Sequence, residues 1–193
     1  MRSNQTLYIT AVILAGGRGR RMGGQDKGLV EYRGIPLIEH VISRIQPQVD
    51  ELIISANRHL ERYAQWGYPV ISDVHAGFQG PLAGIASAWQ HAHTDHLLVV
   101  PCDMPLLPDN LALRLQQAMQ QQQRPLAVAH DGQRLQPLVM LMSTRLQEDM
   151  RDFLASGQRR MHDWCARHKP AIADCSDVAS GFYNMNCLED LLE

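Results

Sequence analysis

The sequence AVILAGGRGRRMGGQDKG, residues 11–28, decides the fold because an apolar run ends directly in glycines and cations. The run before the glycines is apolar on both faces, as expected of a strand in a sheet that is covered on both sides. From Leu14 to Gly28 there are six glycines, three arginines, one lysine and one aspartate. Because ligands of open α/β sheets lie outside the carboxyl ends of the strands, this loop is the first candidate site.

Apolar runs and helix-like patterns alternate along the rest of the chain. We expect strands at Leu7–Leu14, Glu51–Ala56, Pro69–Ser72, His96–Pro101, Leu126–Ala129 and Pro137–Met142. We expect helices at Pro36–Ile45, Leu60–Trp66, Leu82–His93, Pro108–Gln122 and Thr144–Ser156, with a short closing helix in residues 186–193. No linker or repeat divides the chain. The alternation predicts a single α/β domain, residues 1–193, with a mainly parallel sheet.

Bulk composition excludes several classes of function. The formal net charge is −2, so we expect no nucleic-acid partner and no anionic membrane surface. The apolar run of residues 7–15 is about half the ~20 residues that a membrane span needs. The four cysteines are far apart and form no C-x-x-C pair, which disfavours a zinc site or a disulfide framework and favours the reducing cytoplasm.

The glycine-rich loop matches neither of two common phosphate-binding motifs. A P-loop needs G-x-x-x-x-G-K-[ST], whereas Lys27 is preceded by aspartate and followed by glycine. A dinucleotide fingerprint needs G-x-G-x-x-G, and Met22 stands where the third glycine should be. Backbone N–H groups of glycines still converge readily on anions. With Arg18, Arg20, Arg21 and Lys27, the loop suits a polyanion such as a triphosphate, the alternative being a solvated surface loop.

Asp103 is the second candidate, because it follows the apolar strand LLVVP at the same predicted edge of the sheet. Mg²⁺ takes one or two carboxylates together with substrate phosphates and water. A carboxylate facing a cationic triphosphate loop therefore predicts a magnesium site. Taken alone, Asp103 could instead cap a turn or a helix.

Three further places carry polar groups at predicted strand or helix ends. Asp73 ends a strand before Gly80, Pro81 and Leu82, which open a helix whose N–H groups could receive an anion or a nucleoside edge. The second strand ends at Ser55 and Asn57, candidates for reading a base edge. Near the end of the chain, Asn184 and Asn186 share one side of an extended segment and are candidates for supporting a metal or phosphate. Turn and cap chemistry is the alternative in each case.

Together these motifs resemble one group of nucleotidyltransferases. The residues that carry the resemblance are LAGGRGRRMGGQDKG, SANRH, ISD, GPLAG, PCDMPLLP and NMNCLEDL. Within the group, the chain is most similar to the molybdenum cofactor guanylyltransferases, from residue 9 to the end. The resemblance implies a three-layer, Rossmann-like α/β fold. It also implies that GMP passes from GTP to molybdopterin, which normally carries molybdenum, with Mg²⁺ present and pyrophosphate leaving.

The resemblance also implies roles for individual residues. Leu14, Ala15 and Gly16 would line the GTP site, and we expect Gly17 and Arg18 of the same loop to bind the nucleotide as well. Lys27 and Asp73 would contact GTP, and Asp103 would bind magnesium. This chain has Ser55-Ala56-Asn57 where the family often has Asn-Ala-Asn, so either Ser55 or Asn57 could read the nucleotide. Arg159 and Arg160 would supply cations for the pterin phosphate.

We expect Lys27, Arg21 and Asp103 to have catalytic roles. A phosphate monoester has a second pKa of about 6, so the acceptor needs no general base and catalysis is charge neutralisation and positioning. Transient contacts with cofactor-biosynthesis proteins, or with acceptor molybdoenzymes and their chaperones, are expected from the instability of the product. The alternatives are cytidylyl or sugar-phosphate nucleotidyl transfer, and a nucleotide-binding module without turnover.

Overall fold

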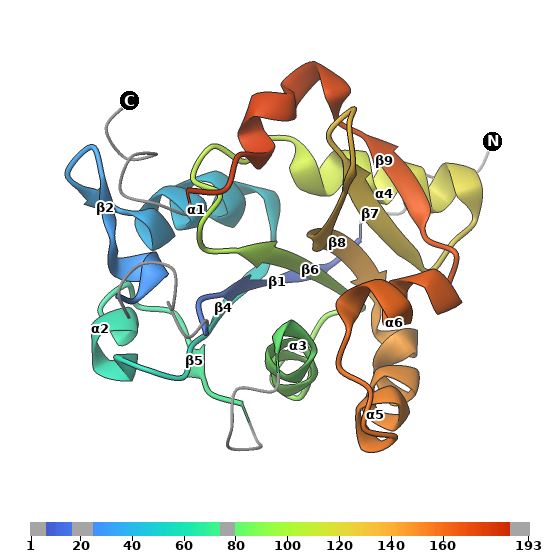
Figure 1. The fold of residues 1–193 in the computed structure, drawn as a ribbon, viewed down its shortest axis with the longest axis horizontal. Coiled ribbons are helices and arrows are strands. Elements are labelled where there is room, and N and C mark those ends of the chain that lie inside the picture. The colour runs from blue at the N-terminus through green and yellow to red at the C-terminus, as the bar shows by residue number, and fades with distance from the viewer. Residues whose placement is uncertain (1–6, 17–24, 74–79, 186–193) are drawn as a thin grey trace.

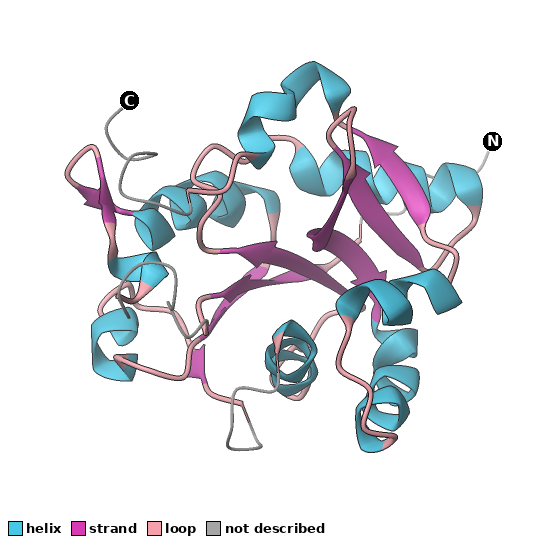
Figure 2. Ribbon diagram, viewed as in Figure 1, coloured by secondary structure: helices cyan, strands magenta, loops and turns pink. Residues whose placement is uncertain are grey.

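A twisted sheet with helices on both faces forms the body of the molecule (Figures 1 and 2). The computed structural model describes residues 7–16, 25–73 and 80–185. The strands of the sheet are β1 (Ile9–Leu14), β4 (Glu51–Ser55), β5 (Val70–Ile71), β6 (His96–Pro101), β7 (Leu126–His130), β8 (Leu135–Ser143) and β9 (Ala171–Asp174). The α-helices are α1 (Leu37–Ile45), α2 (Leu60–Ala64), α3 (Pro81–Trp89), α4 (Leu111–Gln122), α5 (Gln147–Ala155) and α6 (Met161–Arg167).

Smaller elements connect these. β2 (Glu31–Tyr32) and β3 (Ile35–Pro36) form a two-stranded antiparallel ribbon. Arg33 and Gly34 connect the two strands, and both have positive φ. Two positive φ values in a two-residue hairpin are typical of a type I′ turn. The 3₁₀ helices are η2 (Lys27–Leu29), η3 (Gln46–Gln48), η4 (Thr144–Leu146) and η5 (Ser176–Phe182).

The sheet has the strand order β5-β4-β1-β6-β8-β7-β9. β1 pairs in parallel with β4 and β6, β4 with β5, and β7 with β9, whereas β8 runs antiparallel between β6 and β7. This confirms the expected mainly parallel sheet. Because β7 runs in the same direction as β6, the loop from His130 to Leu135 lies at the edge where the parallel strands end.

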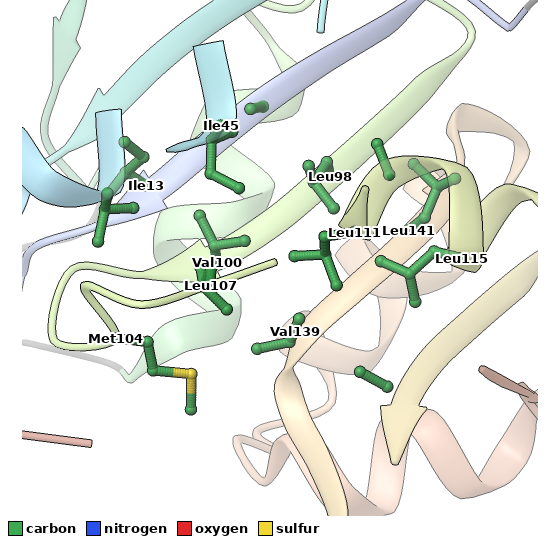
Figure 3. Close-up of a cluster of buried hydrophobic side chains, with 14 of the residues drawn as sticks. Ile13, Ile45, Leu98, Val100, Met104, Leu107, Leu111, Leu115, Val139 and Leu141 are labelled. Atoms are coloured by element: carbon green, nitrogen blue, oxygen red, sulfur yellow. The ribbon is translucent and has the colours of Figure 1, made fainter. Parts of the chain in front are cut away.

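Alternate side chains of the central strands pack into two separate cores. Ile13, Leu98 and Val100 face α1 and α4, in the layer seen in Figure 3. Val12 and Val99 face α3, α5 and α6 on the other side. Figure 1 shows these two helical layers above and below the sheet. Burial on both faces explains why the strand runs are continuously apolar, and it confirms the three-layer architecture.

The structure confirms the six expected strands and five expected helices, with ends displaced by a few residues. It adds β9, α6 and the β2–β3 ribbon, which the sequence did not predict. β9 has only four residues and exposes Ile172, so its apolar pattern is too short to separate from a loop. The expected closing helix, residues 186–193, lies outside the described residues. Among the described residues, none of the helices has the length and apolar character that crossing a membrane requires.

Candidate active site

The ends of four neighbouring parallel strands bring the predicted site residues to one edge of the sheet. Leu14 of β1 is paired with Ser55 of β4 on one side and with Pro101 of β6 on the other, and Ser55 is paired with Ile71 of β5. The backbone immediately after these ends carries Ala15, Gly16, Asn57, Asp73 and Asp103. The edge predicted from the apolar runs is therefore confirmed.

Lys27 and Asp103 form an ion pair at this edge. Lys27 Nζ donates to Asp103 Oδ2 at 3.0 Å, and the two side chains are 23% and 14% exposed. The pair connects η2, which follows the glycine-rich loop, to the end of β6. The Asp103 carbonyl also accepts a hydrogen bond from the Met185 N–H at 2.9 Å, so Asn184 is adjacent in sequence to a residue fixed on Asp103. A partly exposed ammonium beside a carboxylate suits a site that handles phosphate oxygens and a hard cation together.

Asn57 and Asp73 are joined by two hydrogen bonds, and this pair is called the Asn57–Asp73 clasp. Asn57 Nδ2 donates to Asp73 Oδ2, and the Asp73 N–H donates to Asn57 Oδ1, both at 2.9 Å. Burial raises the pKa of the Asp73 carboxyl, and the hydrogen bond from Asn57 opposes that rise. The clasp fixes a half-buried carboxylate between the ends of β4 and β5. Such a group can accept N–H donors from the edge of a bound base.

Ser55 has a different environment from Asn57. Ser55 is 2% exposed, and a Cβ placed on Gly84 of α3 would lie 2.7 Å from its Oγ. A Cβ on Gly16 would lie 3.1 Å from Asn57 Nδ2. The glycines therefore let α3 and the loop after β1 approach these polar residues closely. Ser55 is enclosed under α3, whereas Asn57 is half-buried beside Asp73, and this favours Asn57 as the residue that a nucleotide reaches.

The start of α3 also lies at this edge. Gly80 has φ 86°, a left-handed value that favours glycine, and Pro81 occupies the first turn of the helix. Leu82 is fully buried in the core below the sheet. Its side chain is therefore unavailable to a ligand, and only its backbone N–H is left for the predicted nucleotide contact. That N–H belongs to the first turn of the helix, where backbone N–H groups have no i−4 carbonyl partner within the helix.

Comparison with known proteins identifies the family. A sequence model described as the MobA-like NTP transferase domain matches residues 11–171. The chain belongs to this family. A molybdenum cofactor guanylyltransferase from Shewanella sp. (strain MR-4) is 53% identical over 184 residues, covering 95% of this chain and 93% of the relative.

Solved structures agree on the fold. Molybdopterin-guanine dinucleotide biosynthesis protein A from Archaeoglobus fulgidus superposes with a TM-score of 0.77 at 21% identity, covering 94% of each chain. A 4-diphosphocytidyl-2C-methyl-D-erythritol synthase from Anaerococcus prevotii gives 0.75 at 12% identity, covering 96% of this chain and 93% of that one. At these identities the likeness shows the nucleotidyltransferase fold alone. The three-layer fold expected from the sequence is therefore confirmed for this family member.

The two arginines predicted for the pterin phosphate behave differently. The Arg159 carbonyl lies 3.9 Å from the position of a Cβ on Gly80, so its loop sits beside the start of α3. The Arg159 guanidinium donates to the carbonyls of Leu154 and Gln158 at 2.5 and 2.6 Å, which ties it to its own loop. Arg160 is exposed at the start of α6. The structure therefore places the backbone of Arg159 near the start of α3, whereas its guanidinium is held by carbonyls of its own loop.

Five residues singled out in the sequence lie outside the described part of the chain. These are Gly17, Arg18, Arg20, Arg21 and Asn186. Their roles stay predictions. Within the described residues, no group of three or more His, Cys, Asp or Glu side chains is placed to hold a metal ion.

A buried cluster next to Lys27 was missed from the sequence. Asp26 accepts hydrogen bonds from the Tyr63 hydroxyl at 2.5 Å and from His59 Nδ1 at 3.1 Å, and its side chain is 4% exposed. His59 is the N-cap residue of α2, with a left-handed backbone, and Tyr63 follows four residues later, a spacing that in a sequence predicts two side chains on one helix face. That spacing is the only signal in the sequence, since nothing local connects α2 to Asp26.

Proposed function

We propose that the chain transfers GMP from GTP to the terminal phosphate of molybdopterin and releases pyrophosphate. The observation that carries the proposal is the Lys27–Asp103 pair at the shared end of β1 and β6, in a chain 53% identical to a molybdenum cofactor guanylyltransferase. High identity over nearly the full length favours this acceptor over a sugar phosphate. It also favours GTP over CTP, because the cytidylyl enzyme resembles the chain at only 12% identity.

The chemistry is a displacement at the α-phosphorus of GTP. An oxygen of the acceptor phosphate forms the new P–O bond, and the bond from the α-phosphorus to the bridging oxygen of pyrophosphate breaks. The acceptor oxygen is mostly ionised at neutral pH, because the second pKa of a phosphate monoester is about 6, so no side chain has to remove a proton. Lys27 would neutralise the departing pyrophosphate together with Arg18 and Arg21.

Asp103 fits a role as a magnesium ligand. Its Oδ2 is held by Lys27, its side chain is partly exposed, and a single carboxylate is what Mg²⁺ commonly takes when phosphates supply other ligands. Bound there, the cation would offset the charge that the polyphosphate and the acceptor bring together. Asn184 would support the same cation or its phosphates, because the next residue, Met185, donates its N–H to the Asp103 carbonyl. For Asn186, which lies outside the described residues, the same role rests on the sequence alone.

Location and protein partners are part of the same proposal. We place the enzyme in the cytoplasm, which is supported by the buried, free thiols of Cys102, Cys165 and Cys175. Direct transfer of an unstable product supports transient contacts with cofactor-biosynthesis proteins and with acceptor molybdoenzymes or their chaperones. GTP and molybdopterin are the small-molecule partners.

The decisive experiment measures pyrophosphate release with GTP, Mg²⁺ and molybdopterin, with each component omitted in turn. We expect release only when all are present. A chain that binds GTP and never releases pyrophosphate with the acceptor present would instead be a binding module. Release with CTP in place of GTP would identify a cytidylyltransferase.

A thermal-shift comparison tests the choice of base. A ligand at 100 times its Kd stabilises a fold by about 2.7 kcal/mol, and about 1 kcal/mol moves the Tm of a domain this size by roughly 2–4 °C. GTP with Mg²⁺ should therefore raise the Tm by about 5–10 °C, and CTP, ATP and UTP by clearly less at the same concentration. Stabilisation by CTP alone would contradict the assignment of guanine.

Asn57→Ala is expected to raise the acid limit of GTP binding, which is the pH below which the affinity for GTP falls. Asp73 accepts guanine N–H donors most strongly as a carboxylate, because protonation turns one acceptor oxygen into a donor, so affinity falls as the pH drops through its pKa. Asn57 lowers that pKa, and its removal therefore raises it. A hydrogen bond donated to a charged group stabilises the charged form, so the acid limit of the variant should lie at higher pH than that of the unaltered chain. The measurement is the Kd for GTP from acid to neutral pH.

Asp73→Asn is the matched control for this titration. It keeps the shape of the side chain and has no titrating carboxyl at position 73, so the acid limit should disappear and affinity should be low throughout. An acid limit that is the same in Asn57→Ala and in the unaltered chain would show that Asp73 does not contact the base.

A further inference from the structure

We propose that Tyr63 is a positioning residue for Lys27 and acts through the buried carboxylate of Asp26. The proposal rests on the proposed function in one respect, that Lys27 contacts the nucleotide polyphosphate. Tyr63 lies on α2, far from Lys27 in sequence, and its hydroxyl donates to Asp26, the residue immediately before Lys27.

Asp26 occupies the N-cap position of η2 without capping it. An aspartate at this position usually accepts a hydrogen bond from an N–H of the first turn. Here the side chain makes no cap hydrogen bond. Its two oxygens instead accept the Tyr63 hydroxyl and His59 Nδ1. The carboxylate therefore attaches η2 to α2.

The attachment is strong because the carboxylate and the hydroxyl are both buried. The Asp26 side chain is 4% exposed and Tyr63 is fully buried. A buried carboxylate is costly unless hydrogen-bonded, so losing a donor would favour turning Asp26 toward water. Burial raises the pKa of the Tyr63 hydroxyl far above its usual range, so the hydroxyl remains a donor at neutral pH.

Gly28, which follows Lys27, leaves room for the same hydroxyl because it has no Cβ. A Cβ at Gly28 would overlap the Tyr63 hydroxyl and lie 3.2 Å from two of its ring carbons. The Tyr63 hydroxyl of α2 therefore contacts the residues on both sides of Lys27: it donates to Asp26, and it lies where a Cβ of residue 28 would be. Backbone hydrogen bonds from Leu29 to Asp26 and from Val30 to Lys27, at 3.0 and 3.2 Å, complete the turn. The Lys27 side chain therefore starts from a fixed backbone and reaches Asp103.

A double-mutant cycle separates positioning from general stability. Pyrophosphate release is measured for the unaltered chain, Tyr63→Phe, Lys27→Ala and the double variant. If Tyr63 acts through Lys27, Tyr63→Phe should lower kcat about tenfold in the unaltered chain and less than about twofold when Lys27 is already absent. Equal losses in the two backgrounds would overturn the proposal.

A spectroscopic readout tests the same point without turnover. The chain contains two lysines, Lys27 and Lys169, so a protein labelled with ¹³C-lysine gives two side-chain Hε/Cε signals, assigned with Lys169→Arg. Tyr63→Phe should move the Lys27 signal and leave the Lys169 signal in place. An unmoved Lys27 signal would overturn the proposal whatever the activity.

Two controls complete the design. Tyr68→Phe makes the same chemical change five residues along the chain, at a half-buried tyrosine, and should change neither lysine signal. Thr10→Val removes a buried hydroxyl that donates to Glu51 at the other end of β1, so it matches the loss of stability without touching η2. Absence of pyrophosphate release from the unaltered chain would defeat the proposed function, and the lysine signals would still decide the role of Tyr63.

Discussion

Asp103→Ala is expected to lower pyrophosphate release at least about 100-fold, equivalent to about 2.7 kcal/mol of transition-state stabilisation. Two effects combine. The variant lacks the carboxylate assigned to magnesium, and Lys27 loses the partner that holds its ammonium at 3.0 Å. The measurement is steady-state kinetics with GTP and molybdopterin at increasing Mg²⁺.

Charge and shape can be separated at this position. Asp103→Asn keeps an oxygen that can accept from Lys27 and loses the negative charge, so it should lose nearly as much activity as alanine if the charge binds the cation. Asp109→Ala is a suitable control, because Asp109 is an exposed aspartate in the same connection between β6 and α4, paired with Arg44. Near-normal release by a folded Asp103→Ala protein would contradict the magnesium assignment.

The position of the candidate site could be predicted because its residues follow strand ends. Asp103 follows six strand residues that are almost entirely apolar, and Asp73 and Asn57 follow shorter runs of the same kind. In a parallel sheet, such residues converge once the strands are adjacent. The sequence therefore indicated the edge of the sheet and most of its polar groups without any knowledge of strand order.

Contacts between distant side chains could not be predicted in this way. The Asn57–Asp73 clasp joins residues 16 positions apart, and the Tyr63–Asp26 hydrogen bond joins residues 37 apart. The first contact depends on the pairing of β5 with β4, and the second on the packing of α2 beside η2, and no local pattern specifies either.

Burial also separates residues that looked equivalent in sequence. Ser55 and Asn57 are two positions apart at one strand end, yet Ser55 is enclosed under α3 while Asn57 is half-buried and bonded to Asp73. Which of the two is reached by a nucleotide depends on the close approach of Gly84. A helix with a larger residue there would not pack in this way.

Lys27→Ala is expected to reduce kcat at least about 100-fold, with a smaller change in KM for GTP. The departing pyrophosphate gains charge in the transition state, so a cation directed at it stabilises that state more than the bound substrate. Loss of Lys27 should therefore appear mainly in kcat. Lys169→Ala is the control, because Lys169 is the other lysine of the chain and is exposed beyond α6.

Combining Lys27→Ala with Asp103→Ala tests whether the ion pair acts as one unit. If both residues stabilise the same polyphosphate, the double variant should lose much less than the product of the two single losses. If the two residues act independently, the loss in the double variant should equal the product of the two single losses. A loss confined to KM in Lys27→Ala would mean that Lys27 binds ground state and transition state equally, and the 3.0 Å contact with Asp103 would then organise substrate binding alone.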